Sequence, residues 1–407
     1  MRSPLSGRPA WLEAVIAAVA LPLVIAAAVL AFAWPAGRIS PREVPVGIVG
    51  TGPASQHAVE ALTRAKPGAF DLHLYANRQA ARSAIKNRDV YGAYAISGRS
   101  ITVLKATAAS PSVAQLLTDV GQQLADKATE QIARQEAVDA HSRARAHKQA
   151  AATPGAVQQK AARQDSAGAD SSAQILVKTI DVVPIAAEDP RGVVFSSSVF
   201  PLTICGILIG AFVTMARGLA RPRQRVLTLL VACAVAALGV YLVAQGFLGA
   251  LPHHPVATWA ILSLDLLSIS ATAAGVVRLL GPGGLGLSAA VMVFVGNAFS
   301  GATSAPEMLP EGVDYVGQWL PPGAGASLLR DTTYFDGNSG AGHLAVLALW
   351  SVCGLTAVMF GHWVTGKPRG TQPGATASGE LLPALPGSGE VLPAPRHAHA
   401  HRRDGDG

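Results

Sequence analysis

The stretch LEAVIAAVALPLVIAAAVLAFAW, from Leu12 to Trp34, decides the class of fold, because its residues are almost all apolar. About 20 such residues are enough for a helix to cross the hydrocarbon core of a membrane. The alternative is a cleaved signal peptide, since Ala31-Phe32-Ala33 resembles a cleavage site. The apolar region is longer than the roughly 7 to 15 residues of a signal peptide, so we expect a retained transmembrane helix.

Five further segments are apolar enough to be spans, and the composition of the chain agrees with a membrane protein. Hydrophobic residues make up 50% of the sequence, charged residues make up 14%, and the mean hydropathy is +0.34. The further spans are predicted at Val199–Met215, Val226–Leu251, Val256–Leu280, Gly286–Ser304 and Leu344–Val364. The sequence therefore predicts a polytopic α-helical membrane protein with six transmembrane helices, the last five forming one block over residues 192–365.

The arginines predict the orientation of the spans. The net charge of +7 does not indicate a nucleic-acid partner, because the arginines gather beside apolar segments. Positive charge stays on the cytoplasmic side of a cell membrane. The segment 305–342, which has one arginine and five acidic residues, is predicted to lie outside. A cytoplasmic loop is predicted at ARGLARPRQR, which contains Arg217, Arg221, Arg223 and Arg225. Both termini, residues 1–11 and 366–407, are then cytoplasmic.

Residues 35–191 form one long segment between the first two spans and are predicted to be an extracytoplasmic domain. Strands alternate with helices in its first half, which indicates a small α/β unit. Strands are expected at Val44–Val49, Phe70–Tyr75, Val90–Ile96 and Ile101–Leu104, and helices at Gln56–Lys66 and Asn77–Asn87. Ser110-Pro111-Ser112 opens a long helix with apolar residues at three- and four-residue steps. A strand at Ile175–Ile185 returns the chain to the α/β unit.

Between the long helix and this returning strand, residues 144–173 contain almost no large apolar side chain. Such a segment cannot bury enough surface to offset the entropy of ordering. We expect either a flexible loop or the solvated tip of the long helix.

The sequence VPVGIVGTGPAS, Val44 to Ser55, resembles a dinucleotide-binding turn but lacks its third glycine, which Ser55 replaces. The predicted topology places this turn outside the cytoplasm, where nicotinamide and flavin nucleotides are not normally available. The glycines are better explained by a tight strand-to-helix turn. We therefore predict no cofactor.

No catalytic or metal-binding constellation is visible, and the chain is predicted not to be an enzyme. Cys205, Cys233 and Cys353 lie in apolar runs without disulfide or metal-ligand spacing. His141 and His147 are expected to face solvent. The proline- and glycine-rich tail after Gly366 is predicted to be disordered, and weak metal capture by His397, His399 and His401 is the alternative.

Two stretches resemble the membrane subunits of ABC-2 type transporters, in particular the branch that includes the phage infection protein. One is PIAAEDPRGVVFSSSVFPLTICGILIGAF, Pro184 to Phe212. The other is GNAFSGATSAPEMLPEGVDYVGQWLPPGAGASLLRDTTYFDG, Gly296 to Gly337. The resemblance covers one span, a large external domain and a block of five spans. It implies an export permease that works as a homodimer with a separate ATPase.

The resemblance also implies that the arginine loop, residues 215–225, contacts that ATPase. The chain itself has no P-loop, since GKPRG at Gly366 lacks the required spacing and the Ser or Thr after Lys. The alternative is that these arginines only enforce topology and meet anionic lipid headgroups. Only eleven residues precede Leu12, whereas many such permeases begin with an amphipathic helix. A non-transporting envelope scaffold is therefore the alternative function.

A pathway or gate is predicted where the fifth span ends. Irregular backbone near a membrane must be buried in protein or line a wet cavity, and small residues allow close approach of helices. The candidate residues are Asn297, Ser300, Gly301, Pro306, Leu309, Pro310, Leu320 and Pro321. An amphipathic helix is expected at Val313–Trp319. The alternative is a re-entrant connection that only closes the bundle.

Asp265 lies near the middle of the fourth predicted span. An ionised carboxylate there costs roughly 2.5 to 3.5 kcal/mol, so the side chain should face protein or water. It could lie on a substrate or proton path. The alternative is a protonated or hydrogen-bonded group between helices, for instance with Ser263 or Ser268 as partner. Asn297 and Gln245 are expected to make interhelical hydrogen bonds.

The function that fits these observations best is an ABC-2-like permease that exports a lipophilic or envelope-related substrate. The scaffold is the second hypothesis. An intramembrane enzyme is the third, and no visible nucleophile, base or metal set supports it.

Overall fold

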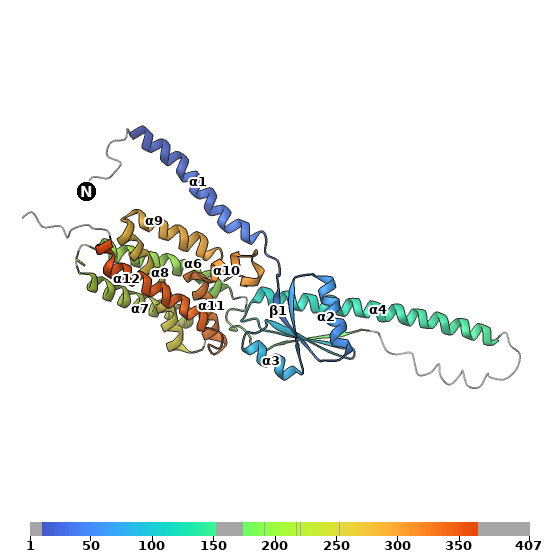
Figure 1. Cartoon of the computed structure of the whole chain (residues 1–407). Coiled ribbons are helices and arrows are strands. Elements are labelled where there is room, and N and C mark those ends of the chain that lie inside the picture. The colour runs from blue at the N-terminus through green and yellow to red at the C-terminus, as the bar shows by residue number, and fades with distance from the viewer. Residues whose placement is uncertain are drawn as a thin grey trace, which may run out of the picture. The chain divides into compact units, whose positions relative to one another are not determined.

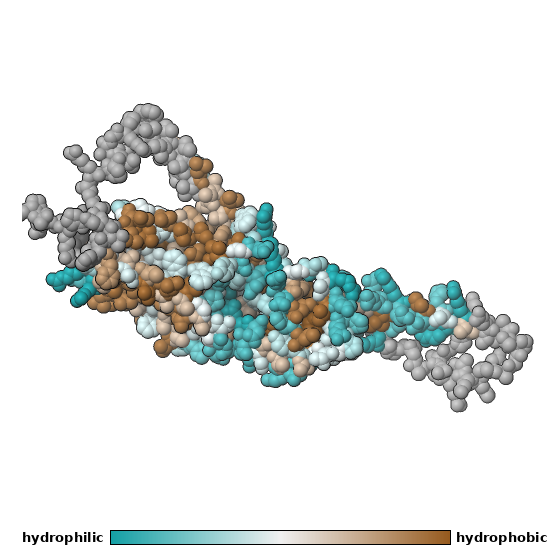
Figure 2. Space-filling view, viewed as in Figure 1, coloured by the Kyte–Doolittle hydropathy of each residue, from teal (hydrophilic) through white to brown (hydrophobic). Residues whose placement is uncertain are grey.

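The structure is a computed structural model that describes residues 10–151, 174–190, 192–216, 218–219, 221–251 and 253–364. These residues form an α/β domain and a group of long apolar helices (Figure 1). Figure 2 shows mostly hydrophobic residues over the long helices, and hydrophilic residues with hydrophobic patches among them over the α/β domain. Residues 1–9 of the predicted cytoplasmic N-terminus, 1–11, and the predicted disordered tail lie outside the described residues.

A five-stranded sheet forms the centre of the α/β domain. Its strands are β1 (Val44–Val49), β2 (Phe70–Tyr75), β3 (Gly92–Ser97), β4 (Ser100–Lys105) and β5 (Leu176–Asp181). Their order is β2-β1-β3-β4-β5, with β3 and β4 antiparallel and the other neighbours parallel. All five predicted strands are present, although β5 is shorter than Ile175–Ile185.

Three helices accompany this sheet: α2 (Pro53–Ala65), α3 (Arg78–Lys86) and α4 (Pro111–Ala151). The predicted tight turn precedes α2, with Gly50 at a φ of +116° that favours glycine. Residues 144–151, part of the segment predicted to be flexible, belong to α4, as expected of a helix tip. Residues 152–173 lie outside the described part of the chain.

Four described helices are long and apolar enough to cross a membrane. They are α6 (Val193–Met215), α7 (Pro222–Gly246), α8 (Pro255–Leu280) and α12 (Ala341–Val364), the last of which qualifies over Ala341–Gly361. They occupy the positions of the second, third, fourth and sixth predicted spans. α8 packs against the other three, and glycines bring the backbones close. A Cβ on Gly354 of α12, for instance, would lie 2.5 Å from the carbonyl carbon of Ala271.

The first and fifth predicted spans are helical but differ from the other four. The first lies within α1 (Ala10–Ala36), a helix of 27 residues. The fifth begins as α9 (Gly283–Ala289) and continues as the π-helix η1 (Ala290–Asn297). The helical stretch ends at Asn297, seven residues before Ser304, and the chain then turns at Gly301, whose φ is +66°. A total of six spans stays a prediction.

Three short helices connect η1 to α12: η2 (Pro306–Met308), α10 (Val313–Gln318) and α11 (Pro321–Tyr334). The predicted amphipathic helix at Val313–Trp319 is α10. Leu320 and Pro321, two predicted site residues, begin α11, because proline is well suited to the first turn of a helix.

Candidate functional site

The chain between η1 and α10, residues 298–312, forms the junction loop, which contains most of the predicted gate residues. The Ser300 hydroxyl donates to the carbonyl of Asn297 at 2.8 Å and accepts from the amide of Ala302 at 3.2 Å. The Gln318 side chain of α10 donates to the Ser300 carbonyl at 2.9 Å. These bonds satisfy the irregular backbone internally, as is required where lipid cannot do so.

Polar groups of the α/β domain hold the other end of the junction loop. Arg42, which lies just before β1, donates to the carbonyl of Leu309 at 2.7 Å. The Ser110 hydroxyl, which is fully buried ahead of α4, donates to the carbonyl of Ser304 at 2.6 Å. The two donors are far apart in sequence, so the whole α/β domain must be folded for them to bind the loop together.

Apolar side chains join the same two parts. Ala305 and Met308 of the junction loop, and Phe335 after α11, are buried in the hydrophobic core of the α/β domain. Pro306 begins η2, and Leu309 follows it. Leu309 and the next residue, Pro310, are buried. Gly301, Pro306, Leu309 and Pro310 are therefore brought together where the domain meets the helices.

A buried ion pair lies beside the junction loop. Arg88, between α3 and β3, pairs with Asp331 of α11, whose side chain is completely buried. Burial alone would lower the pKa of the Arg88 guanidinium, but the neighbouring Asp331 carboxylate, Tyr91 and Glu307 raise it above its ordinary value. Arg88 also has a φ of +61°, an uncommon conformation for a residue other than glycine. Its guanidinium is thus directed at α11 and stays charged.

Tyr91 and Glu307 extend this polar contact. The Tyr91 hydroxyl donates to a Glu307 carboxylate oxygen at 2.7 Å. Burial, and then the Glu307 charge, raise the pKa of the Tyr91 phenol well above its ordinary value, so the phenol remains a donor at neutral pH. A cavity of 210 Å³ adjoins these groups. Its lining includes Arg88, Tyr91, Glu307, Gln318, Ser327, Ser339 and His343.

Arg330, the neighbour of Asp331 on α11, contacts the junction loop and α6. Its guanidinium donates to the carbonyl of Ala302 at 3.1 Å and lies 4.8 Å from the ring centre of Phe195 in α6. Burial, and then the nearby Arg88, lower the pKa of Arg330 to about 10, which leaves it charged at neutral pH. Arg330 thus joins the junction loop, α11 and α6.

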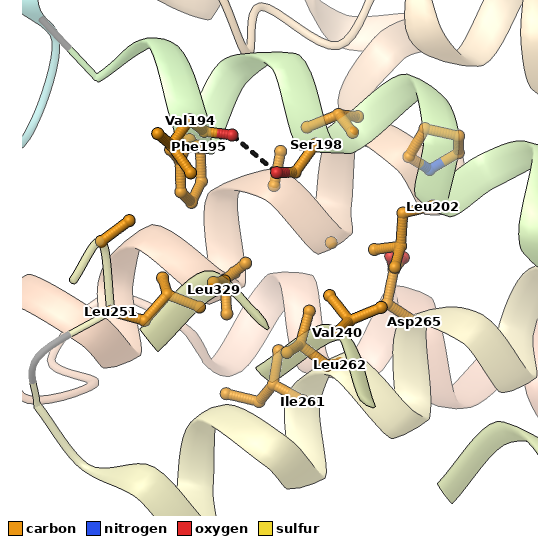
Figure 3. Close-up of a pocket in the computed structure, with 16 residues that line it drawn as sticks. Val194, Phe195, Ser198, Leu202, Val240, Leu251, Ile261, Leu262, Asp265 and Leu329 are labelled. Atoms are coloured by element: carbon orange, nitrogen blue, oxygen red, sulfur yellow. Dashed lines mark hydrogen bonds between the residues drawn. The ribbon is translucent and has the colours of Figure 1, made fainter. Parts of the chain in front are cut away.

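A second feature is an apolar groove of 610 Å³ between α6 and α7. It adjoins a deeper pocket of 40 Å³ that α6, α7, α8 and α11 enclose (Figure 3). The two share Val194, Ser198, Leu202, Val240 and Ala244. An apolar groove on the side of the helices is therefore separated from a pocket inside the bundle only by side chains that line both.

Asp265 of α8 and Leu202 of α6 both line the deeper pocket (Figure 3). Its side chain is 5% exposed, and the buried Oδ1 atom has no hydrogen-bond partner in the structure. The hydroxyls of Ser263 and Ser268 donate to backbone carbonyls. The predicted hydrogen bond from one of these serines to the Asp265 carboxylate is therefore wrong.

Of the two predicted interhelical hydrogen bonds, one is present. Thr203 of α6 donates to the side chain of Asn297 in η1 at 3.3 Å, as expected. Gln245 instead accepts from the backbone amide of Leu251 at 2.9 Å, in the loop that follows α7. The Leu251 amide lies in the loop after α7, and the Gln245 side chain supplies its acceptor.

The predicted arginine loop follows the far end of α6, away from the groove. Arg221 and Arg223 are exposed, and Arg225 donates to the carbonyl of Leu219 at 2.8 Å. Arg217 lies outside the described residues. In the described part of the chain, no group of three or more His, Cys, Asp or Glu side chains is placed to hold a metal ion.

Sequence reasoning found the junction loop and Asp265 but missed the residues that bind the loop to the α/β domain. Arg42, Arg88, Tyr91 and Ser110 lie in a different part of the chain from their partners. One indication of these contacts is present in the sequence, the charged dipeptide Arg330-Asp331. It follows a run of small and apolar residues in PPGAGASLLRD, where two buried charges would need partners.

Comparison with known proteins identifies the family. No curated protein and no solved structure matches the chain. The model of the family described as "ABC-2 family transporter protein" matches residues 14–360. That match includes the long apolar helices, the α/β domain and the junction loop. Because it covers most of the sequence, the chain belongs to the ABC-2 transporter family and is a multi-pass membrane permease.

Proposed function

We propose that this ABC-2 permease exports a lipophilic or envelope-related substrate and that a separate subunit hydrolyses the ATP. The observation that supports a lipophilic substrate is the apolar groove between α6 and α7, which adjoins the pocket beneath Asp265. A compound dissolved in the bilayer can enter such a groove from the side without crossing a polar surface. The chain itself would not be an enzyme.

The topology that we propose has six spans in the cell membrane and both termini in the cytoplasm. α1 is the first span, and α9 with η1 and the start of the junction loop is the fifth. The arginine loop after α6 supports this orientation through the positive-inside rule. The α/β domain then lies outside the cytoplasm, and two copies of the chain form the transporter with lipid around them.

In this arrangement the junction loop is an extracytoplasmic gate. Its contacts with Arg42 and Ser110 connect it to the α/β domain, and Arg330 connects it to α6, which lines the groove. A shift of α6 or α11 would therefore be transmitted to the α/β domain through the junction loop. This contrasts with a loop that only closes the bundle, which would need no bonds to a separate domain.

The ATPase is proposed to bind the loop that contains Arg217, Arg221, Arg223 and Arg225. The exposed Arg221 and Arg223 can pair with acidic side chains of a partner. Binding of the same arginines to anionic lipid headgroups is the alternative.

The test is a pull-down of the tagged protein from its native membrane in mild detergent, with bound proteins identified by mass spectrometry. A matched variant changes all four arginines to glutamine, after its membrane insertion has been checked. We expect a stoichiometric P-loop ATPase with the wild type and its loss with the variant. Recovery of envelope proteins only, across several detergents, would favour the scaffold over the permease.

A further inference from the structure

We propose that the groove between α6 and α7 binds an amphiphile with a cationic amine head, and that Asp265 pairs with the amine. This inference rests on the proposed function and adds a substrate class to it. The groove holds the apolar tail, and the pocket behind it holds the head.

The groove has the size and lining that an apolar tail requires. Its volume of 610 Å³ lies within the range of about 300–1,000 Å³ that is usual for ligand sites. Val193, Val243 and Leu248 are exposed at its mouth. An alkyl chain suits this lining, because neither the chain nor these side chains carry a polar group that would lose hydrogen bonds on contact.

The pocket behind the groove has room for a compact polar head. It has a volume of 40 Å³, and roughly 10–15 Å³ is enough to admit one water molecule. Gly325 of α11 lies against the Asp265 carboxylate, where any larger side chain would displace it. The absence of a side chain at Gly325 thus leaves the carboxylate at the pocket wall.

The Asp265 carboxyl has no basic side chain near it in this pocket. Among the described residues that line the pocket and the groove, Asp265 is the only Asp or Glu, and none is Lys, Arg or His. Burial without a partner disfavours the ionised form of a carboxyl group. A ligand that brings an ammonium group would stabilise the ionised form and supply N–H donors to a carboxylate whose Oδ1 atom has no hydrogen-bond partner in the structure.

This complementarity selects among amphiphiles of equal tail length. An alcohol head could offer one hydrogen bond but no charge. A carboxylate head would be repelled by an ionised Asp265, and a trimethylammonium head has charge but no N–H to donate. The primary amine is the head that supplies both.

The experiment measures binding of radiolabelled dodecylamine to the full-length protein in lipid nanodiscs, with binding to empty nanodiscs subtracted. Unlabelled dodecylamine, dodecanol, dodecanoate and dodecyltrimethylammonium compete in parallel. We expect dodecylamine to compete at a concentration roughly ten-fold or more below the others, the factor that a charged hydrogen bond contributes.

Three variants test whether Asp265 and the groove cause the preference for the amine. Asp265→Asn, which is nearly isosteric, should remove the preference for the amine. Val243→Trp should fill the groove and weaken all four competitors. Asp126→Asn changes an exposed carboxylate on α4 and should behave as the wild type.

Equal competition by all four compounds in the wild type would overturn the inference and indicate a lipid chain as the occupant. Retention of the amine preference in Asp265→Asn would overturn it as well. If Asp265→Asn fails to insert, the wild-type series still decides. Because binding needs no ATPase, loss of the head preference with an intact ATPase complex would leave the proposed function standing.

Discussion

At the scale of single residues, the account depends on the buried pair Arg88–Asp331. Removal of one partner from a buried ion pair costs about 3–5 kcal/mol, because the other charge is left uncompensated. Arg88→Ala should therefore open the junction loop, and hydrogen exchange at residues 303–309 should rise at least roughly a hundred-fold. Exchange followed by mass spectrometry in nanodiscs measures this change.

The control for this prediction is Arg82→Ala, which removes an exposed arginine of α3. It should leave exchange at the junction loop unchanged. The double variant Arg88→Met with Asp331→Leu should recover much of the protection, because apolar residues can replace a buried pair. Equal exchange in Arg88→Ala and Arg82→Ala would contradict a role of the pair in holding the junction.

A smaller effect is predicted for Tyr91→Phe. The raised pKa keeps the Tyr91 phenol protonated, and its removal deprives the Glu307 carboxylate of a donor. The cost should be about 1.5–3 kcal/mol, measured by the same exchange of the junction loop. Tyr315→Phe, on the exposed side of α10, is the control and should have no effect. An equally small response in both variants would mean that the Tyr91 bond does not hold the loop.

At the scale of elements, the packing of α12 on α8 depends on glycine. Gly354→Ala would place a methyl group against the backbone of Ala271 and Thr272, and overpacking of this kind costs about 1–3 kcal/mol. Gly239→Ala in α7 meets nothing within 4 Å and is the matched control. Thermal denaturation in one detergent should therefore show a lowered midpoint for Gly354→Ala only. Identical midpoints would show that α12 is free to shift on α8.

Sequence patterns predicted the elements well, for a physical reason. Strands and spans are local features, because alternation or a long apolar run is present in a single stretch of chain. The predicted end of the fifth span was wrong. The apolar run continues to Ser304, but the backbone already turns at Gly301. Backbone direction at a glycine is invisible in hydropathy.

Contacts between distant parts of the chain could not be predicted in this way. Arg88 and Asp331 are 243 residues apart, and neither sits in a recognisable motif. The burial of Ala305 and Met308 in the core of the α/β domain is likewise a tertiary property. Asp265 could be selected because a carboxylate in an apolar span is costly, yet its lack of a serine partner needed the structure.

At the scale of the whole molecule, the α/β domain and the long helices share the junction loop, Arg88 and Asp331. Two parts joined by a buried ion pair and a common core should move as a unit or separate completely. A permease needs such a connection if its external side responds to ATP. A scaffold would not require any movement of its helices.

The most direct test is hydrogen exchange of the purified complex with the proposed ATPase partner, compared between the nucleotide-free state and the state trapped with ADP and vanadate. We predict that exchange changes together in residues 88–91, in residues 303–309 and along α6. The exposed half of α4, residues 130–146, should stay constant and serves as the internal control. Identical exchange in both states throughout residues 298–334 would contradict a gate at the junction loop that responds to ATP.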